Sequence, residues 1–456
     1  MSSKQKKLKM GNVLNPLIKN SIANIVFLII FLTGIFTRSF LGLNLFSFRI
    51  GELAIGFSFV LSIYFLFYGK PKQFFNFGKT RFKIVHQIII IYFLVRIGIN
   101  FSDINLYNFK VSSYIWTIAF IYFGSIIANF SSNGIIIKSL MFSMPLFVYI
   151  FHTGNYPNFI ITFFLNNSDK FQFIKASDMV MSVIASSFFI KQYSSKKTFS
   201  LFWSYFLVSL YLPLVAANSR GAVGGLLLFF IFNTIFSFTE IKQLRYKFIL
   251  LFIVSAVVFS ISSLRVSGAS FDSPDNQSEL TIVEEIPLAV KKIAEEKNTE
   301  DVFLSLYIQD GRIYSIDPTT NWRLDIWQDV FEDLNDKNRL IRGYGYGEII
   351  PVMTDPSAPG RLGRDGLNEN VHNYFVNTLA RGGLINLALF IYLNVELIKL
   401  LRASSLKNHA FTYMLPCLFM ASVDIPMEGV QFPLIYYFFI GYYLSEKTLI
   451  SNRSGE

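Results

Sequence analysis

Long apolar segments recur along almost the whole chain, and they restrict it to a fold that crosses a lipid bilayer. A helix needs about 20 mostly apolar residues to span roughly 30 Å of hydrocarbon. Hydrophobic residues make up 52% of the 456 residues and charged ones only 16%, a balance too apolar for a soluble protein of this length. About twelve segments are long enough: 21–37, 51–69, 84–101, 111–130, 135–152, 176–192, 199–217, 221–239, 246–263, 374–401, 408–424 and 429–445. We therefore expect an all-α polytopic membrane protein with about twelve transmembrane helices.

The basic residues predict how these helices are oriented. The chain has a formal net charge of +11, but groups of lysines and arginines precede the first predicted helix and follow each even-numbered one. This distribution obeys the positive-inside rule, so both termini are expected in the cytoplasm. The charge then reflects membrane topology, and no nucleic-acid partner is expected. The first apolar segment lacks a small-residue cleavage pattern after it and is expected to be retained.

One polar stretch, residues 264–371, interrupts the apolar pattern between the ninth and tenth predicted helices. It holds 20 of the chain's 30 acidic residues against 11 of its 41 basic ones, so its net charge is −9. Because it follows an odd-numbered helix, we expect it on the extracytoplasmic side as a large, partly helical periplasmic loop, with its acids on a solvated surface. The chain then divides into a membrane domain over 1–263, this loop, and a second membrane part over 372–456.

Inside the loop, local patterns predict two helices separated by irregular segments. Residues 272–279 are typical of a flexible connector, and 282–297 of a charge-rich amphipathic helix that Pro287 interrupts. A second helix is expected after Pro318–Asn321, with Arg323 in its first turn, where backbone N–H groups favour an anion. Its predicted apolar face consists of Leu324, Trp327, Val330, Phe331 and Leu334.

Three polar clusters should meet on the extracytoplasmic face. They are Asn218–Gly221, the loop with Arg323 and His372, and the segment from Asp424 to Glu428. His372 should lie at the start of the tenth helix, where a neutral imidazole can accept a proton from a hydroxyl group. The alternative is an interfacial histidine that bonds only to water or backbone.

The arginines of these clusters are candidates for anion binding. Arg220 stands at the membrane interface on the outer side, against the positive-inside trend, and a guanidinium group fits phosphate oxygens in a bidentate manner. Arg96 is a secondary phosphate candidate, whereas Arg38 and Arg49 are expected to flank the first outer loop.

Other motifs have a structural and a functional interpretation. Asp424 and Glu428 could position a sugar or orient the histidine, or they could form a solvated turn. The segment Gly343–Gly347 could bind phosphate through backbone amides, although a glycine-rich turn is the commoner explanation. The Gly221-x-x-x-Gly225 spacing is typical of helix packing.

No metal site is predicted, because His86, His152, His372 and His409 lie in different segments and match no ligand spacing. Cys417 is the only cysteine, so the loop contains no disulfide.

Together these motifs resemble the O-antigen ligase and O-antigen polymerase superfamily. The residues that carry the likeness run from about Ser200 to the carboxyl end, and the twelve-helix plan extends it to the whole chain. The matching motifs are Asn218–Ala222, Arg323-x-x-x-Trp327, Gly343–Gly347, His372–Phe375 followed by Gly382-Gly383, and Asp424–Gln431.

The resemblance implies a GT-C-type membrane glycosyltransferase of the bacterial inner membrane. Such an enzyme moves a glycan from undecaprenyl diphosphate to an acceptor hydroxyl on the periplasmic side, with inversion and without a metal or other cofactor. His372 would then be the general base, and Arg220 and Arg323 would bind the diphosphate. The acceptor could be the lipid A core, as for a ligase, or a lipid-linked repeat unit, as for a polymerase. A chain-length regulator or a flippase could be a protein partner.

Two other functions remain open from the sequence. A polytopic transporter of bicarbonate-like anions within the same superfamily is one, although a transporter should carry its charges near mid-membrane in repeated halves. An assembly partner that docks through the acidic loop is the other, but it gives His372 and Arg323 no role.

Overall fold

The computed structural model of the chain describes most of the predicted membrane helices and about half of the polar loop. The described residues are 16–68, 81–98, 106–130, 134–154, 156–168, 174–194, 197–244, 246–267, 306–362, 369–404 and 406–453. The predicted connector 272–279 and the predicted helix 282–297 lie outside these residues.

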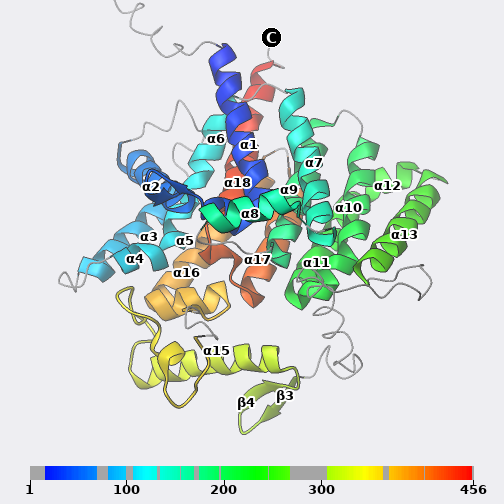
Figure 1. Ribbon diagram of the computed structural model, residues 1–456. Helices are drawn as coiled ribbons and strands as arrows, with labels where there is room; N and C mark the ends of the chain where they lie inside the picture. The colour runs from blue at the N-terminus through cyan, green and yellow to red at the C-terminus, as the bar shows by residue number, and fades with distance from the viewer. Residues whose placement is uncertain are drawn as a thin grey trace, which may run out of the picture.

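The described chain is mostly helical (Figure 1). Its helices in the membrane part are α1 (Pro16–Leu41), α2 (Ile50–Ile63), α3 (Arg81–Gly98), α4 (Leu106–Val111), α5 (Ser113–Trp116), α6 (Phe120–Phe130), α7 (Ile135–Thr153), α8 (Asn158–Asn167), α9 (Ala176–Tyr193), α10 (Lys197–Asn218), α11 (Arg220–Phe236), α12 (Phe238–Leu244), α13 (Tyr246–Val266), α16 (Tyr374–Arg402), α17 (His409–Val423) and α18 (Gln431–Arg453). The loop contributes α15 (Pro318–Asp336) and an antiparallel hairpin of β3 (Leu306–Gln309) and β4 (Arg312–Ser315), in which Leu306 pairs with Ser315. A second hairpin joins β1 (Asn44–Leu45) to β2 (Phe48–Arg49).

Each of the twelve predicted apolar segments coincides with a helix or with consecutive helices. Within the described residues, six helices are both long and apolar enough to cross a membrane, and a seventh candidate is the pair α11 and α12, bent by 70°. The remaining segments are shorter, as in α17, or more polar, as in α9. The multi-pass helical class is therefore confirmed, while the number of twelve spans is not.

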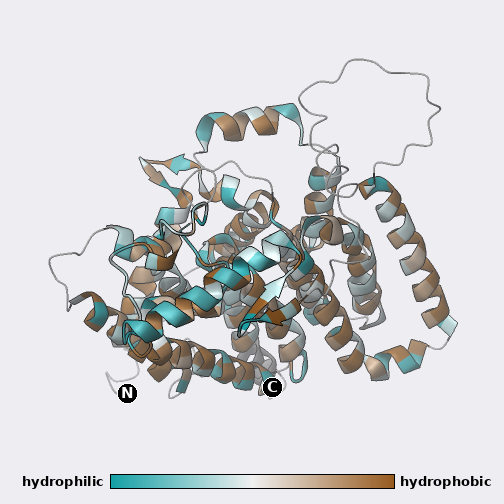
Figure 2. Cartoon of the chain, turned by 90° about the horizontal axis from the view of Figure 1, so that it is seen from below, coloured by the Kyte–Doolittle hydropathy of each residue, from teal (hydrophilic) through white to brown (hydrophobic). Residues whose placement is uncertain are grey.

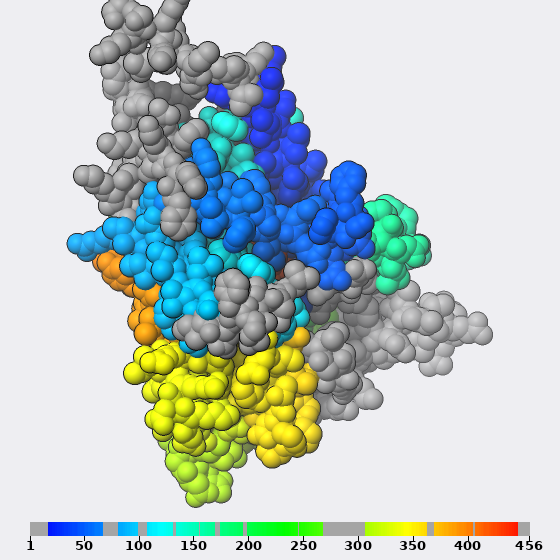
Figure 3. Space-filling view, turned by 90° about the vertical axis from the view of Figure 1, so that its left-hand side faces the viewer, coloured from blue at the N-terminus to red at the C-terminus, as the bar shows by residue number. Residues whose placement is uncertain are grey.

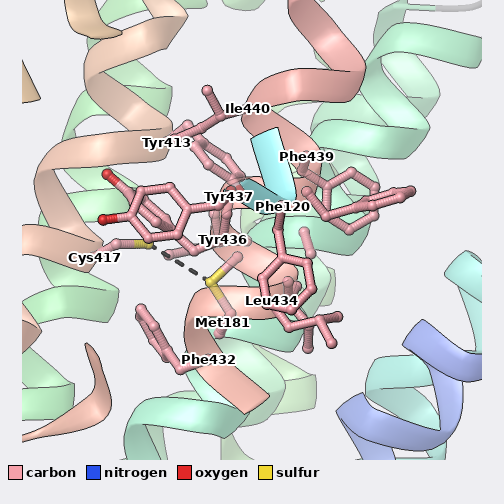
Figure 4. Close-up of a cluster of buried hydrophobic side chains, with 14 of the residues drawn as sticks. Phe120, Met181, Tyr413, Cys417, Phe432, Leu434, Tyr436, Tyr437, Phe439 and Ile440 are labelled. Carbon is pink, nitrogen blue, oxygen red and sulfur yellow. Dashed lines mark hydrogen bonds between the residues drawn. The ribbon is translucent and has the colours of Figure 1, made fainter. Parts of the chain in front are cut away.

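The core of the bundle is built around α9, α17 and α18. Met181 of α9 lies against Cys417 of α17, with 3.8 Å between the two sulfur atoms (Figure 4). The Tyr413 hydroxyl donates a hydrogen bond of 3.0 Å to the backbone oxygen of Tyr436. All of these side chains are buried, so Cys417 contributes to packing.

Two glycines allow α6 and α18 to approach closely. A Cβ atom on Gly124 would lie 1.9 Å from the Phe438 backbone oxygen, and one on Gly441 would lie 1.8 Å from that of Ile121. Small residues at such positions let transmembrane helices pack backbone to backbone. The predicted packing role of Gly221 and Gly225 is confirmed in the same way, since both face α17.

Gly124→Ala should therefore destabilise the protein. The clash is with backbone, which cannot move aside, so we expect the free energy of unfolding to fall by about 1–3 kcal/mol. Thermal unfolding in detergent, followed by tryptophan fluorescence, measures the loss. Gly56→Ala in α2 is the matched control, because nothing lies within 4 Å of its added Cβ. Equal stability of the two variants would contradict this packing.

The loop forms a polar layer against one end of the bundle. Residues 306–362 occupy the lower part of the molecule in Figure 3, and α15 is mostly hydrophilic in Figure 2, whereas the helices behind it are mostly hydrophobic. Its buried residues are Ile326, Val330 and Leu334. Phe331, predicted on the apolar face, is 48% exposed, because that face is centred on Ile326.

The acidic residues of α15 form ion pairs within the loop. This corrects the expectation that the acids of the loop only form a solvated surface. Asp325 and Asp329 both bind Arg361, whose side chain is only 4% exposed. The same two acids and Glu332 bind Arg312 of β4, with the Asp325 contact at 3.2 Å. Opposite charges at this spacing tie the hairpin and the proline-rich segment to one face of α15.

A break in α16 receives the glycine-rich segment. Gly383 has φ +70°, which interrupts the helix, and a Cβ atom there would lie 2.1 Å from the Ile341 backbone oxygen. The freed carbonyl groups of Ala380 and Arg381 accept hydrogen bonds from the backbone nitrogens of Tyr344 and Gly345, at 2.7 and 2.9 Å. Gly343–Gly347 is therefore a structural turn that locks the loop onto α16.

Candidate functional site

His372 lies two residues before α16, as predicted. Its φ of +54° is uncommon for a residue other than glycine, and both neighbours hold it. The Val371 carbonyl accepts a hydrogen bond of 2.6 Å from the Trp327 indole nitrogen. The Asn373 side chain caps α16 by accepting from the backbone nitrogens of Phe375 and Val376. Strain of this kind persists where the surroundings fix it, often at functional sites.

The surroundings of the imidazole keep it neutral. Its ring centroid is 5.1 Å from that of Trp322, and its Nδ1 is 4.0 Å from Oδ1 of Asp424. The pKa of His372 is lowered to about 4, mainly by burial and then by the charge of Arg323, while Asp424 acts in the opposite direction. At pH 7 the side chain can therefore accept a proton.

Arg323 approaches the same point from α15. Its Nη1 donates a hydrogen bond of 2.5 Å to the backbone oxygen of Val423, the residue before Asp424. Its Nε is buried and has no hydrogen-bond partner among the described residues. The prediction that Arg323 occupies the first helical turn is wrong, because Asp317 caps the helix and Pro318 begins it. Arg323 thus lies in the second turn.

Arg220 is held at the start of α11 by the cap of α15. Its Nη2 is 3.1 Å from Oδ1 of Asp317, which is 3% exposed. The other carboxylate oxygen of Asp317 accepts from the backbone nitrogen of Thr320 at 2.9 Å. Next to Arg220, a Cβ atom on Gly221 would lie 2.5 Å from a Val423 methyl group. The three predicted polar clusters therefore meet around Val423.

The segment Asp424–Gln431, called here the 424–431 turn, joins α17 to α18. Oδ1 of Asp424 accepts from the Ile425 backbone nitrogen at 2.9 Å, which fixes the carboxylate near His372. Both carboxyl oxygens of Glu428 are buried and lack hydrogen-bond partners among the described residues. Burial raises the pKa of Glu428 to about 8, with Arg381 opposing, so this group is largely protonated at pH 7. A solvated turn is excluded for Glu428.

Arg96 lies on the far side of the glycine-rich turn. Its Nη2 donates to the Gly343 carbonyl at 3.3 Å. Arg381 lies beside the same turn, is 1% exposed, and donates to the backbone oxygen of Glu348 and to the Tyr107 hydroxyl at 3.2 Å. Both arginines therefore support the loop.

Two further cations belong to the site that the sequence patterns did not single out. Arg38, at the end of α1, and Lys175, just before α9, both act electrostatically on His372 and Glu428. The expectation that Arg38 only flanks the first outer loop is therefore incomplete, whereas Arg49 does so by pairing with Glu52 at 3.7 Å. One feature of the sequence could have identified Arg38 and Lys175. Both are expected on the outer side of the membrane, where a cation is as unusual as Arg220 is.

This arrangement combines a proton acceptor with fixed positive charge at one end of the bundle. The neutral imidazole can take a proton from a hydroxyl group, and the guanidinium groups can bind oxygen atoms that carry negative charge. Within the residues that the structure describes, no group of three or more His, Cys, Asp or Glu side chains is placed to hold a metal ion.

A comparison with known protein families gives a match that covers these residues. Residues 204–391 match a family model described as O-antigen ligase. The matched range extends from α10 into α16 and includes Arg220, Arg323 and His372, so the resemblance seen in the motifs is confirmed over this part of the chain. A comparison with curated proteins found no match.

Proposed function

We propose that this chain, whose residues 204–391 match a family model described as O-antigen ligase, is a metal-independent, inverting membrane glycosyltransferase. It would move a glycan from undecaprenyl diphosphate to an acceptor hydroxyl at the periplasmic face of the bacterial inner membrane, with both termini in the cytoplasm. One observation carries this proposal. A neutral imidazole lies beside guanidinium groups at the edge of the bundle, as acid–base chemistry on a phosphate-linked substrate requires.

In the proposed step, His372 accepts the proton of the acceptor hydroxyl. The acceptor oxygen attacks the anomeric carbon of the donor sugar, and the bond from that carbon to the phosphate oxygen breaks. Undecaprenyl diphosphate leaves with the electron pair, so the anomeric configuration inverts. Asp424 faces Nδ1, so we assign Nε2 as the atom that accepts the proton, and Asp424 stabilises the imidazolium that forms.

We assign Arg220 and Arg323 to stabilise the negative charge that develops on the leaving diphosphate. Their side chains approach Val423 and Asp317 from different helices, and the buried Nε of Arg323, which has no hydrogen-bond partner among the described residues, is a donor for a phosphate oxygen. Fixed donors of this kind stabilise a transition state without reorganising. The polar loop over residues 264–371 would cover this site, between the membrane parts 1–263 and 372–456.

The placement of the charges favours transfer over transport. Arg220 begins α11, Asp424 follows the end of α17 and His372 precedes α16, so these groups gather at helix ends. A transporter of small anions is expected to carry them near the middle of its helices.

Transfer should stay active at mildly acidic pH. Because His372 must be neutral and its pKa is lowered to about 4, we expect a constant rate from about pH 8 to 5 and a decline centred near pH 4. An unperturbed histidine would give a decline near about 6.5. Initial rates in membranes at each pH measure this, and return to pH 7 separates protonation from denaturation. Asp424→Asn should move the decline to lower pH, because the carboxylate favours the imidazolium.

The acceptor decides between a ligase and a polymerase, and a deletion strain tests it. If the protein is a ligase, long glycan should accumulate on its carrier lipid. If it is a polymerase, the lipid core should carry a single repeat unit. Gel electrophoresis of surface glycan and extracted lipid distinguishes the two patterns, and normal long glycan on the core would contradict both.

A further inference from the structure

The start of α9 lies against one end of the 424–431 turn, and Arg323 lies at the other end of the same turn. Arg323 bonds to Val423, immediately before the turn, whereas the Asp178 side chain of α9 is hydrogen-bonded to Gln431, its last residue. The first turn of α9 therefore faces the same site from the other direction.

Lys175 brings a positive charge to this place without a close ion pair among the described residues. No carboxylate of the described residues is within 4.0 Å of its ammonium group. Burial lowers the pKa of Lys175, and the like charge of Arg38 acts in the same direction. An ammonium group that is buried and close to another cation is stabilised by an anion between them.

Ser177, two residues further on, adds a hydrogen-bonding group. It is 2% exposed, and its hydroxyl has no hydrogen-bond partner among the described residues. A buried hydroxyl without a partner costs free energy unless a ligand or water satisfies it. The adjacent backbone N–H groups at the start of this 18-residue helix carry the positive end of its dipole.

The charges of the surrounding groups leave room for an anion. Asp178 and Asp424 attract Lys175 electrostatically, whereas Arg38 repels it, and Glu428 is largely protonated at pH 7. Arg220 is already paired with Asp317. Arg323, Lys175 and Arg38 all act as positive charges on His372.

We propose that Lys175, Ser177 and Arg38 form a second phosphate subsite, opposite the subsite of Arg220 and Arg323. One phosphate group of the lipid diphosphate would bind at each subsite, and the sugar, attached to one of the two phosphates, would lie toward the 424–431 turn and His372. This inference rests on the proposed function. It identifies the side chains that would let the site bind a diphosphate more tightly than a monophosphate.

The test compares how the full-length protein binds farnesyl diphosphate and farnesyl monophosphate in detergent, measured by isothermal titration calorimetry. Lys175→Met should weaken diphosphate binding by roughly tenfold or more, because a charged hydrogen bond is lost. Monophosphate binding should change by at most about twofold, because a single phosphate can still use the other subsite. Lys175→Arg should restore most of the diphosphate affinity. Lys191→Met is the matched control, because Lys191 lies at the other end of α9 and contacts Ser237 at 2.9 Å.

Unchanged diphosphate binding in Lys175→Met, or equal weakening of both ligands, would overturn the second subsite. Arg323→Ala separates this result from failure of the proposed function. If Arg323→Ala weakens diphosphate binding and Lys175→Met does not, only the second subsite is wrong. If neither variant weakens it, the diphosphate site itself is wrong. Arg38→Gln, measured in the same way, replaces Lys175→Met if that variant does not fold.

Discussion

Replacing His372 with asparagine should abolish glycan transfer while the protein remains folded in the membrane. A positioned general base contributes about 10²- to 10⁴-fold to a rate, and in the proposed step the imidazole of His372 is the group that accepts the proton. Asparagine tolerates the left-handed backbone that φ +54° imposes, so this variant removes the imidazole with little added strain. Transfer from undecaprenyl-diphosphate-linked glycan in isolated membranes measures the loss.

His409→Asn is the matched control for this prediction. His409 begins α17, whereas Asp424 follows the end of the same helix, so the two histidines lie at opposite ends of the bundle. The control should retain long surface glycan. Near-normal glycan in the His372 variant, with wild-type amounts of protein in the membrane, would rule out the proposed role of the imidazole.

Arg323→Ala should lower the transfer rate by roughly 10²-fold or more, in line with the loss of one donor that stabilises developing charge. The variant also removes the hydrogen bond to Val423 and one of the charges that lower the pKa of His372. Arg323→Lys should recover little activity, because an ammonium group cannot make the same bidentate contact with phosphate. The rate at saturating donor should fall, since the charge develops in the transition state.

The control for Arg323 is Arg339→Ala, which removes one positive charge from an exposed position of the same loop. It should leave both the rate and the amount of folded protein unchanged. If Arg323→Lys were as active as the wild type, a simple positive charge would suffice and the bidentate role would be excluded.

Local patterns were enough to predict much of the fold. The start of α16 after His372 and the packing of Gly221 on α17 are both properties of short segments. The start of α15 was misplaced because Asp317 and Pro318 together make a better helix start than the polar residues after them. The number of spans is a different kind of property, since helices such as α9 are buried among their neighbours and need not be strongly apolar.

The sequence by itself determined the helical membrane class, the polar loop and the residue types at the site, because apolar length, charge bias and motif spacing are written along the chain. Only the tertiary structure decided which residues share the site. Arg38 and Lys175 join His372 from segments far away in sequence, and the glycine-rich turn proved to lock the loop onto α16. The physical reason is that burial and charge coupling act through space. The lowered pKa of His372 depends on Arg323 and on the packing around the imidazole, and no local pattern records those distances.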